Sequence, residues 1–177
     1  MKTCRWKLLV VGVISLLGAT ATHAIPITVA FTATGFVPLI GSTPAPDDPV
    51  SGTLVYDAAS VNSPINSLTS ISLTINGHTY GLSEIGFLTD FGLGEIGGLI
   101  DGVNGSGNFE DDFLILWERA TLTPLLFLYA TANSGEIWTT SNFSQFSVTA
   151  SPVPEPATLA LLALCLLSVT AARKIRS

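Results

Sequence analysis

Residues 68–82 read LTSISLTINGHTYGL, and this stretch decides the fold class. Isoleucine and leucine alternate with serine and threonine up to Ile75, which is the two-residue period of a strand with one buried face. Asn76 and Gly77 follow at once, and both tolerate the positive φ angles of a type I′ turn. Residues 78–80 then supply a returning strand. The stretch therefore predicts a β-hairpin.

Further strands are predicted on both sides of this hairpin. They are expected at residues 25–37, 50–57, 113–118, 125–131 and 143–149. Residues 38–49 hold four prolines and predict an exposed connection, and the glycine-rich residues 85–101 predict irregular turns or short, kinked strands.

No 3.6-residue pattern lies between the chain ends, so the predicted fold class is all-β. We expect an antiparallel β-sandwich with jelly-roll-like connections, flanked by an N-terminal signal helix and a C-terminal transmembrane helix. An open barrel is the alternative architecture. The chain order of the strands does not follow from these patterns.

Residues 1–24 predict a secretory signal peptide. Three basic residues precede an apolar run over 8–17, and small residues follow as far as Ala24. Cleavage is predicted after Ala24, and a cut after Ala21 fits the same small-residue rule. Residues 25–152 are then the exported domain.

Residues 153–177 form a second special segment. The motif Val153-Pro154-Glu155-Pro156 is followed by the uncharged residues 157–172 and by a basic end over 173–177. Sixteen helical residues rise about 24 Å, short of a hydrocarbon core of about 30 Å, but the helix extends into the basic end, whose charges lift to the interface along aliphatic stems. The predicted membrane anchor is represented by Ala157, Leu161, Leu164, Ala172, Arg173, Lys174 and Arg176.

Together, the motif, the helix and the basic end resemble the PEP-CTERM sorting signal of exported bacterial proteins. The resemblance covers only residues 153–177. It implies recognition by an exosortase, a membrane-embedded cysteine protease that cuts near the motif, and a setting in bacteria that make extracellular polysaccharide and biofilm. Pro154 and Pro156 keep Glu155 out of a helix, in an extended form that a protease can grip. A plain proline linker before an anchor is the simpler alternative.

The charge distribution places the domain outside the cytoplasm. Of seven basic residues, six lie in the two end segments, which leaves Arg119 against thirteen acidic residues between Ile25 and Pro156, a formal charge of −12. Positive flanks stay cytoplasmic, so we expect an inner-membrane anchor before processing, then the cell envelope or extracellular matrix. Because of this negative charge, nucleic acid and anionic lipid are poor partners, and no nucleic-acid partner is expected. Cys4 and Cys165 both lie outside the domain, so no disulfide is expected within it.

Catalytic residues are not predicted. His78 is the domain's one histidine, and no serine stands in a Gly-x-Ser-x-Gly context, so His78 is expected on the hairpin surface. The rival hypothesis is a secreted polysaccharide hydrolase that uses a carboxylate pair.

An acidic loop is a weak candidate for calcium. Its oxygen-bearing residues are Asp101, Asn104, Asn108, Glu110, Asp111 and Asp112. The loop fails the EF-hand spacing, because Val103 and Ser106 occupy the third and sixth positions from Asp101. A solvated acidic loop is the simpler interpretation, and no other cofactor is expected.

Large rings could stack on sugars in a binding domain. Trp117 and Tyr129 lie in apolar strands and are expected in the core, Tyr80 is a further ring, and Trp138, with polar neighbours, is the best candidate for exposure. Arg119 is expected at an exposed or rim position, because the apolar pattern stops at Glu118.

The sequence thus predicts a non-enzymatic, acidic exported protein of the envelope or matrix, and the resemblance implies sorting by a PEP-CTERM and exosortase-type system. Its domain is expected to have a structural or ligand-binding role. Candidate partners are the exosortase, the membrane through the tail helix, and extracellular polysaccharide.

Overall fold

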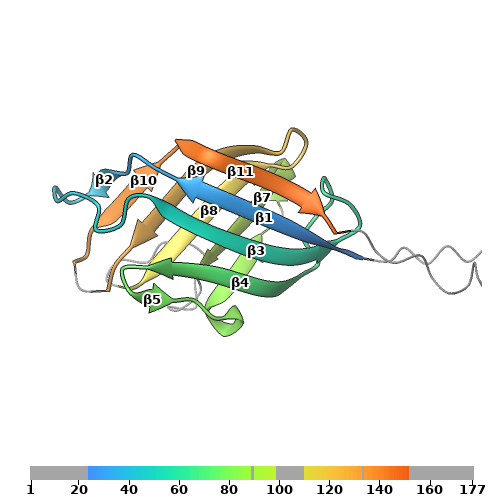
Figure 1. Ribbon diagram of the computed structural model, residues 1–177, viewed down its shortest axis with the longest axis horizontal. Coiled ribbons are helices and arrows are strands. Elements are labelled where there is room, and N and C mark those ends of the chain that lie inside the picture. The colour runs from blue at the N-terminus through green and yellow to red at the C-terminus, as the bar shows by residue number, and fades with distance from the viewer. Residues whose placement is uncertain (1–23, 89, 99–109, 133, 152–177) are drawn as a thin grey trace, which may run out of the picture.

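The computed structural model describes residues 24–88, 90–98, 110–132 and 134–151. These residues form eleven strands and two short 3₁₀ turns, η1 (Leu82–Glu84) and η2 (Asp90–Gly92), without an α-helix. All strand pairs are antiparallel, and the strands make two sheets (Figure 1). The all-β prediction is therefore confirmed. The predicted signal helix and transmembrane helix lie outside the described residues.

The first sheet brings together the first and last strands of the described residues. Its strands, in spatial order, are β11 (Phe143–Ala150), β1 (Ile25–Ala33), β3 (Val50–Ala58), β4 (Ser67–Ile75) and β5 (His78–Thr79). The last strand thus lies beside the first, with Val29 opposite Val148.

The second sheet is largely a meander. Its spatial order is β2 (Val37–Ile40), β10 (Ile137–Thr140), β9 (Thr123–Ala130), β8 (Asp112–Glu118), β7 (Leu93–Gly98) and β6 (Ile85–Leu88). The expected jelly-roll-like connections are not found in this sheet, because five strands that follow one another in the chain are also neighbours in space. Strands that follow one another in the chain commonly pair directly, without crossing to another sheet.

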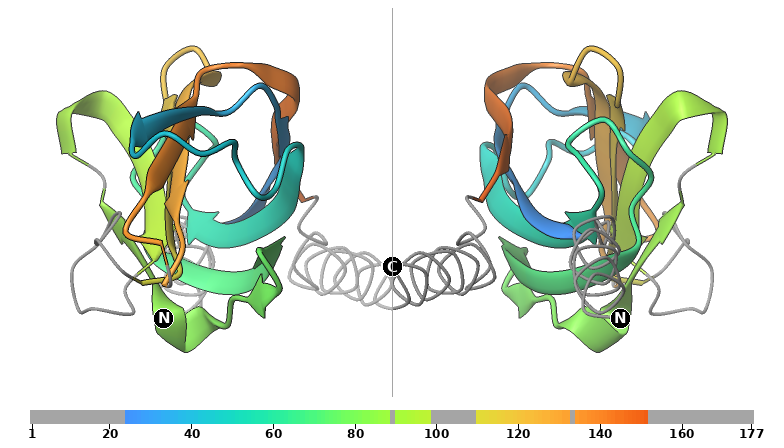
Figure 2. Two further views of the ribbon diagram at one scale, coloured as in Figure 1. Left: turned by 90° about the vertical axis from the view of Figure 1, so that its left-hand side faces the viewer. Right: turned by 90° about the vertical axis from the view of Figure 1, so that its right-hand side faces the viewer.

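The two sheets face each other (Figure 2), and their inward side chains share one hydrophobic core. Phe31 of β1 packs on Phe127 of β9 with ring centroids 5.2 Å apart, and Tyr56 of β3 packs on Trp117 of β8 at 6.1 Å. All four rings are at most 3% exposed. Each pair joins one sheet to the other, so the inward side chains of both sheets form a single interior.

The hairpin predicted over residues 68–80 is confirmed. Asn76 and Gly77 have φ angles of 50° and 82°, which are the positive values that a type I′ turn requires. The expected strands at 50–57, 113–118, 125–131 and 143–149 also match β3, β8, β9 and β11 within two residues.

Two strands were missed. The expected exposed connection contains β2, in which Pro38 is tolerated because this edge strand pairs with β10 alone. β10 itself is short, and its alternation is masked by Thr139 and Thr140.

The strands run between two ends of the molecule, which we call the near end and the far end. At the near end β1 begins and β11 finishes, on the right of Figure 1, and the N–H of Ser151 donates to the carbonyl oxygen of Pro26 at 2.9 Å. The far end carries the β4–β5 turn, η1, the start of β8 and the loop 41–49.

Near-end loops are tied to one another by hydrogen bonds. The side-chain amide of Asn62, in the β3–β4 loop, donates to the carbonyl oxygens of Arg119 at 2.8 Å and Ala120 at 3.0 Å. The N–H of Arg119 donates to the carbonyl oxygen of Gly92 at 3.1 Å. The β3–β4 loop, the β8–β9 turn and the β6–β7 turn therefore lie together at the near end.

The exposed or rim position expected for Arg119 is wrong. The strand does end at Glu118, as expected, but Arg119 is only 9% exposed. The β3–β4 loop closes over the turn through Asn62, and this contact between distant segments could not be deduced from the apolar pattern of β8 alone.

Candidate functional site

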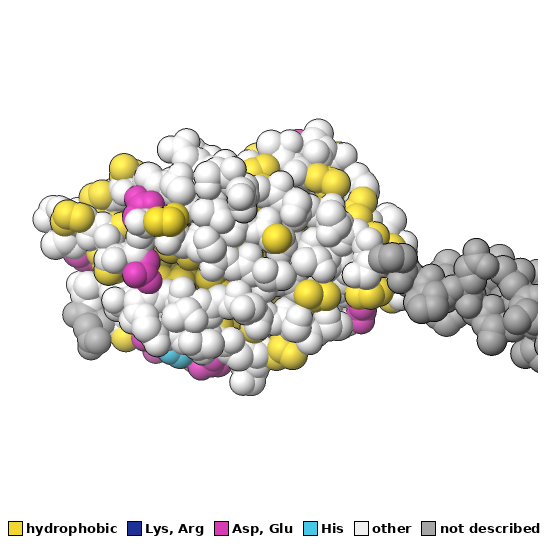
Figure 3. Space-filling view, in the orientation of Figure 1, with side chains coloured by type: hydrophobic (Ala, Val, Ile, Leu, Met, Phe, Trp, Pro, Cys, Tyr) yellow, Lys and Arg dark blue, Asp and Glu magenta, His cyan; other side chains and the backbone are white. Residues whose placement is uncertain are grey.

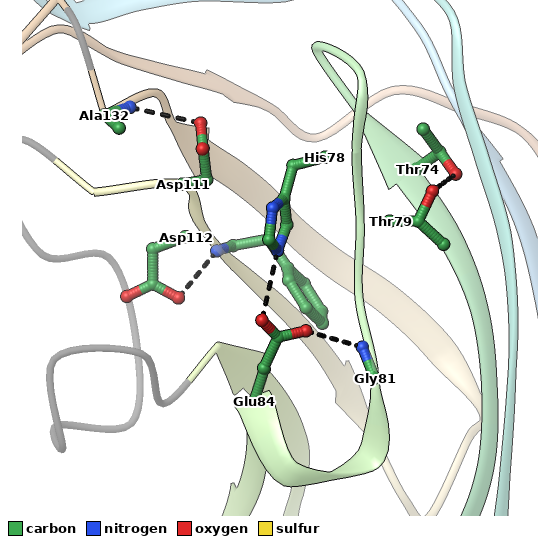
Figure 4. A network of polar contacts seen from close by, with 9 residues as sticks. Thr74, His78, Thr79, Gly81, Glu84, Asp111, Asp112 and Ala132 are labelled. Atoms are coloured by element: carbon green, nitrogen blue, oxygen red, sulfur yellow. Dashed lines mark hydrogen bonds and ion pairs between the residues drawn. The ribbon is translucent and has the colours of Figure 1, made fainter.

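A cluster of polar side chains lies at the far end (Figure 4). The Nε2 atom of His78 is 3.6 Å from a carboxylate oxygen of Glu84, an ion pair only when the histidine is protonated. The other oxygen of Glu84 accepts from the N–H of Gly81 at 2.7 Å. Asp111 accepts from the N–H of Ala132 at 3.1 Å, and Asp112 from its neighbour Phe113 at 2.9 Å. Each of these carboxylates is thus held by the backbone of a loop or strand end.

Tyr80 lies under this cluster. Its ring packs edge-on against His78, with centroids 4.7 Å apart, and against Phe113 at 4.8 Å. Burial raises the pKa of the Tyr80 phenol, and the nearby Asp112, Asp111 and Glu84 carboxylates raise it further. The phenol therefore stays neutral, and the cluster has a negative local potential.

The cluster does not have the arrangement of a metal centre. Within the described part of the chain, no three His, Cys, Asp or Glu side chains converge on a point where an ion could bind. Of the calcium candidates, Glu110, Asp111 and Asp112 are described, and Asp112 is fully buried at the start of β8. Asp101, Asn104 and Asn108 lie outside the described residues, so weak calcium binding there stays a prediction.

The four candidate sugar-stacking rings are all buried. Tyr80, Trp117 and Tyr129 are at most 3% exposed, and so is Trp138, which was the best candidate for exposure. The indole N–H of Trp138 donates to the carbonyl oxygen of Thr43 at 2.9 Å, so the loop that follows β2 covers the ring.

Glu136 holds in place the loop that follows β2 and covers Trp138. Its carboxylate accepts from the N–H of Ser42 at 3.1 Å and from the hydroxyl and N–H of Thr43. The hydroxyl of Thr43 is the main cause of the lowered pKa of this carboxyl. The polar neighbours of Trp138 therefore anchor a loop over the ring instead of marking an exposed binding site.

The outer face of the first sheet carries a different kind of surface. Four neighbouring strands, β11, β1, β3 and β4, turn neutral and mostly hydroxyl-bearing side chains away from the core. We call this the hydroxyl face, and its residues are Thr28, Ala30, Thr32, Ser51, Thr53, Val55, Ser70, Ser72, Thr74, Gln145, Ser147 and Thr149. Figure 3 shows the face, where white neutral side chains cover the middle and acidic side chains stand toward the margins.

The sheet register arranges these side chains in rows. Gln145, Thr32 and Ser51 lie side by side on three strands, and the hydroxyls of Thr32 and Ser51 are 3.0 Å apart. Thr53 lies opposite Ser72 in the next row. Neighbouring strands are about 4.8 Å apart and successive outward residues about 6.8 Å, so the face is a regular lattice of hydroxyl groups.

A shallow hollow of about 360 Å³ lies within the hydroxyl face. Gly52 and Phe31 are part of its lining, and Thr32, Ser51, Thr53, Ser72 and Gln145 contribute polar groups. A side chain at Gly52 would press on the Phe31 ring, which explains why glycine stands at this position of β3. The hollow offers hydroxyl and amide groups and no carboxylate.

Sequence reasoning missed the hydroxyl face. The alternation of serine and threonine along residues 68–75 and 25–37 predicts only the polar side of each single strand. The polar sides of these strands form one surface only because β11 lies beside β1 and β1 lies beside β3. These pairings join parts of the chain that are distant in sequence, so they do not follow from a local pattern.

Comparison with known proteins bears on the C-terminal segment. A family model described as the PEP-CTERM protein-sorting motif matches residues 152–176. This confirms the resemblance found over residues 153–177, although the sorting and anchor residues lie outside the described residues. No curated protein and no solved structure gave a match. Among the residues that the structure describes, no helix has the length and apolar character needed to cross a membrane.

Proposed function

We propose that this chain, which carries a PEP-CTERM protein-sorting motif, is an exported protein that binds neutral polysaccharide in the cell envelope or matrix. The motif implies export and processing by an exosortase. We infer in addition that the chain is held in the inner membrane by its tail before processing, with residues 25–151 outside the cytoplasm. The two sheets around one core support a β-sandwich for this region.

The observation that carries the binding role is the uncharged hydroxyl face. Each serine and threonine hydroxyl is one donor and two acceptors, and the amide of Gln145 adds donors and an acceptor, so the face matches the hydroxyl groups of a sugar chain. Hydrogen bonds to sugars replace hydrogen bonds to water and give little net free energy each, about 1 kcal/mol. We therefore expect weak binding at one hollow, strengthened when many copies contact one polymer.

Charge favours a neutral polymer over an acidic one. The region between the chain ends has a formal charge of −12, and a polyanion would be repelled by it. The twelve residues of the hydroxyl face have no formal charge, and Asp57, the next outward residue of β3 after Val55, is an acidic residue at the near-end margin of the face. A neutral glycan can approach this face without removing water from a charged group.

A non-enzymatic role is part of the proposal. Hydrolysis of a glycoside needs two carboxyl groups that flank the bond. The hollow in the hydroxyl face is lined by none, and Glu84, Asp111 and Asp112 are held by backbone N–H groups at the far end. Activity on a neutral glycan that disappears in Glu84→Gln or Asp111→Asn would favour the hydrolase instead.

The binding role is tested by placing a charged side chain in the hydroxyl face. Ser72→Lys puts an ammonium group at the exposed centre of the face, and Ser83→Lys adds the same charge at an exposed site on η1, away from it. We expect retention of the chain on immobilised neutral glucans to fall about tenfold with Ser72→Lys and to stay unchanged with Ser83→Lys. Equal retention of both variants would contradict the role of this face.

The sorting role is tested in a host that has an exosortase. Replacing Pro154, Glu155 and Pro156 by alanine lets the segment join the following helix and removes the extended form. We expect the unprocessed chain to accumulate in the membrane fraction, measured by its mass. Normal processing of this variant would show that the motif is not what the protease recognises.

A further inference from the structure

One aromatic side chain of the described region is held in water. Phe91, in the turn between β6 and β7, is 99% exposed, and Leu88 at the end of β6 is 47% exposed. Phe91 has a φ angle of 54°, a left-handed conformation that costs free energy in any residue with a Cβ atom. The ring packs on nothing in the fold, so its exposure is not explained by the core.

The turn is nevertheless held in place. The carbonyl oxygen of Gly92 accepts the N–H of Arg119, and Leu93 is paired with Glu118 in the sheet. Arg119 is buried and is tied to the β3–β4 loop by Asn62. The ring of Phe91 is therefore presented outward from a fixed position at the near end.

The near end is also the end at which the chain leaves the fold. β11 finishes at Ala150, Ser151 is hydrogen-bonded to Pro26, and the sorting motif begins at residue 152. The apolar run begins at Ala157, six residues after Ser151, and six fully extended residues span at most about 20 Å. A chain anchored by that run keeps its near end within this distance of the bilayer.

Most of the acidic residues in the described part of the chain lie at the far end, and four do not: Asp57, Asp90, Glu95 and Glu118. Of thirteen acids in the chain, eleven remain when Asp101 and Glu155, outside the described residues, are set aside. Seven of these eleven lie at the far end: Asp47, Asp48, Glu84, Glu110, Asp111, Asp112 and Glu136. The end that faces the bilayer is thus the less acidic one, and it bears the exposed ring.

We propose that Phe91 and Leu88 form a membrane-contact tip that enters the bilayer interface while the tail anchors the chain. Phenylalanine and leucine are residues that interfacial segments bury at the boundary of head groups and acyl chains. Because the chain is acidic, the partner is a bilayer with neutral head groups. The inference rests on the anchored form in the proposed function, and it adds that the near end touches lipid instead of standing off in water.

The test uses the full chain reconstituted in phosphatidylcholine vesicles without exosortase. Phe91→Trp places a fluorescent indole at the tip, and Leu39→Trp places one at an exposed apolar site on β2, away from the near end. Tryptophans of the parent chain contribute equally to both variants and are subtracted. Lipid with brominated acyl chains should quench the added fluorescence of Phe91→Trp, and should leave that of Leu39→Trp unchanged.

Flotation with the vesicles separates the two ideas. A chain that floats while the indole of Phe91→Trp remains open to an aqueous quencher and is untouched by brominated lipid would overturn the membrane-contact tip alone. A chain that does not float would overturn the anchored form, and the tip with it. Quenching of both variants would show that the domain lies on the bilayer without a preferred end, which also contradicts the inference. Quenching of Phe91→Trp alone supports it, and shows that lipid suffices without the protease.

Discussion

Three tyrosines of the core carry phenols whose ionisation is suppressed by burial. Burial raises the pKa of Tyr56 to about 12, with Arg119 acting in the opposite direction. Burial also raises the pKa of Tyr129 to about 12, although its hydrogen bond with the backbone of Asp47 lowers it. The pKa of Tyr80 is raised as well, by burial and by the far-end carboxylates.

We predict a loss of stability that begins near pH 10. In the unfolded chain the phenols lose their protons near the ordinary pKa of 10, whereas the folded chain holds the phenols of Tyr56 and Tyr129 neutral until about pH 12. Unfolding then releases protons, so the free energy of unfolding falls as pH rises between these values. Tyrosinate absorbance should appear together with loss of the β-sheet signal. Tyrosinate that forms near pH 10 in a folded chain would contradict the burial of these rings.

Arg119 is expected to matter for stability, because it is buried. Arg119→Met removes the guanidinium from the groups that surround it in the fold. Breaking a buried charged contact lowers the free energy of unfolding by about 3 to 5 kcal/mol. We predict a fall in Tm of about 10 °C or more that high salt does not reverse, measured by thermal unfolding. Because Arg119 lowers the pKa of Tyr56, that pKa should rise in the variant.

The control for this prediction is the neighbouring exposed carboxylate. Glu118→Gln removes a charge at the end of β8 and should change stability by about 0 to 1 kcal/mol. Equal, small effects of Arg119→Met and Glu118→Gln would mean that the arginine lies in solvent.

At the scale of elements, glycine decides how β7 packs. A Cβ atom at Gly94 would overlap the ring of Trp117 on the adjacent strand, and one at Gly98 would overlap the carboxylate of Asp112. The glycine-rich segment that the sequence left ambiguous is therefore a regular strand crossed by a large ring. Bare backbone in β7 makes room for the ring of β8.

We predict that Gly94→Ala destabilises the fold by about 1 to 3 kcal/mol, because Trp117 cannot move without disturbing the core. Gly81→Ala is the matched control, since a Cβ atom at Gly81 would make only ordinary contacts at 3.6 and 3.9 Å. Denaturant unfolding of both variants measures the difference. Similar midpoints for the two would contradict the packing of Trp117 across β7.

Elements with a strong local signal were predictable, and those without one were not. Asn76 and Gly77 gave the hairpin because the turn geometry depends on those two residues alone. β10 was not predicted, because its four residues form a strand through pairing with β9 on one side and β2 on the other. Trp138 was misplaced for the same reason, since the loop covering it comes from a segment about 95 residues away.

The whole molecule depends on pairings that no local pattern contains. The hydroxyl face needs β11 beside β1, which brings Ser147 next to Ala30. The sequence supplied the right residue types for that surface, but not the neighbours that make it one surface. The sorting tail was predictable for the opposite reason, because its motif, apolar run and basic end are contiguous.

Residues 25–151 should fold without either end of the chain. The core draws on both sheets, and Cys4 and Cys165 lie outside this region, so no disulfide is needed. We predict a soluble product with a far-ultraviolet circular dichroism spectrum of β-sheet and a Tm that a reducing agent leaves unchanged. A helical spectrum would contradict this expectation.

The pairing of β1 with β11 determines how the molecule responds to a pull. In the proposed anchored form, a tail held in the membrane would pull on β11 along the strand axis, and a glycan bound to the outer face of β1, β3 and β4 would resist. Antiparallel hydrogen bonds lie perpendicular to the strands, so this load shears the whole register from Ile27 to Ala33 at once instead of opening one bond after another. The last strand, β11, would therefore transmit tension between matrix and membrane. The domain would unfold under this load only when all the hydrogen bonds between β1 and β11 break together.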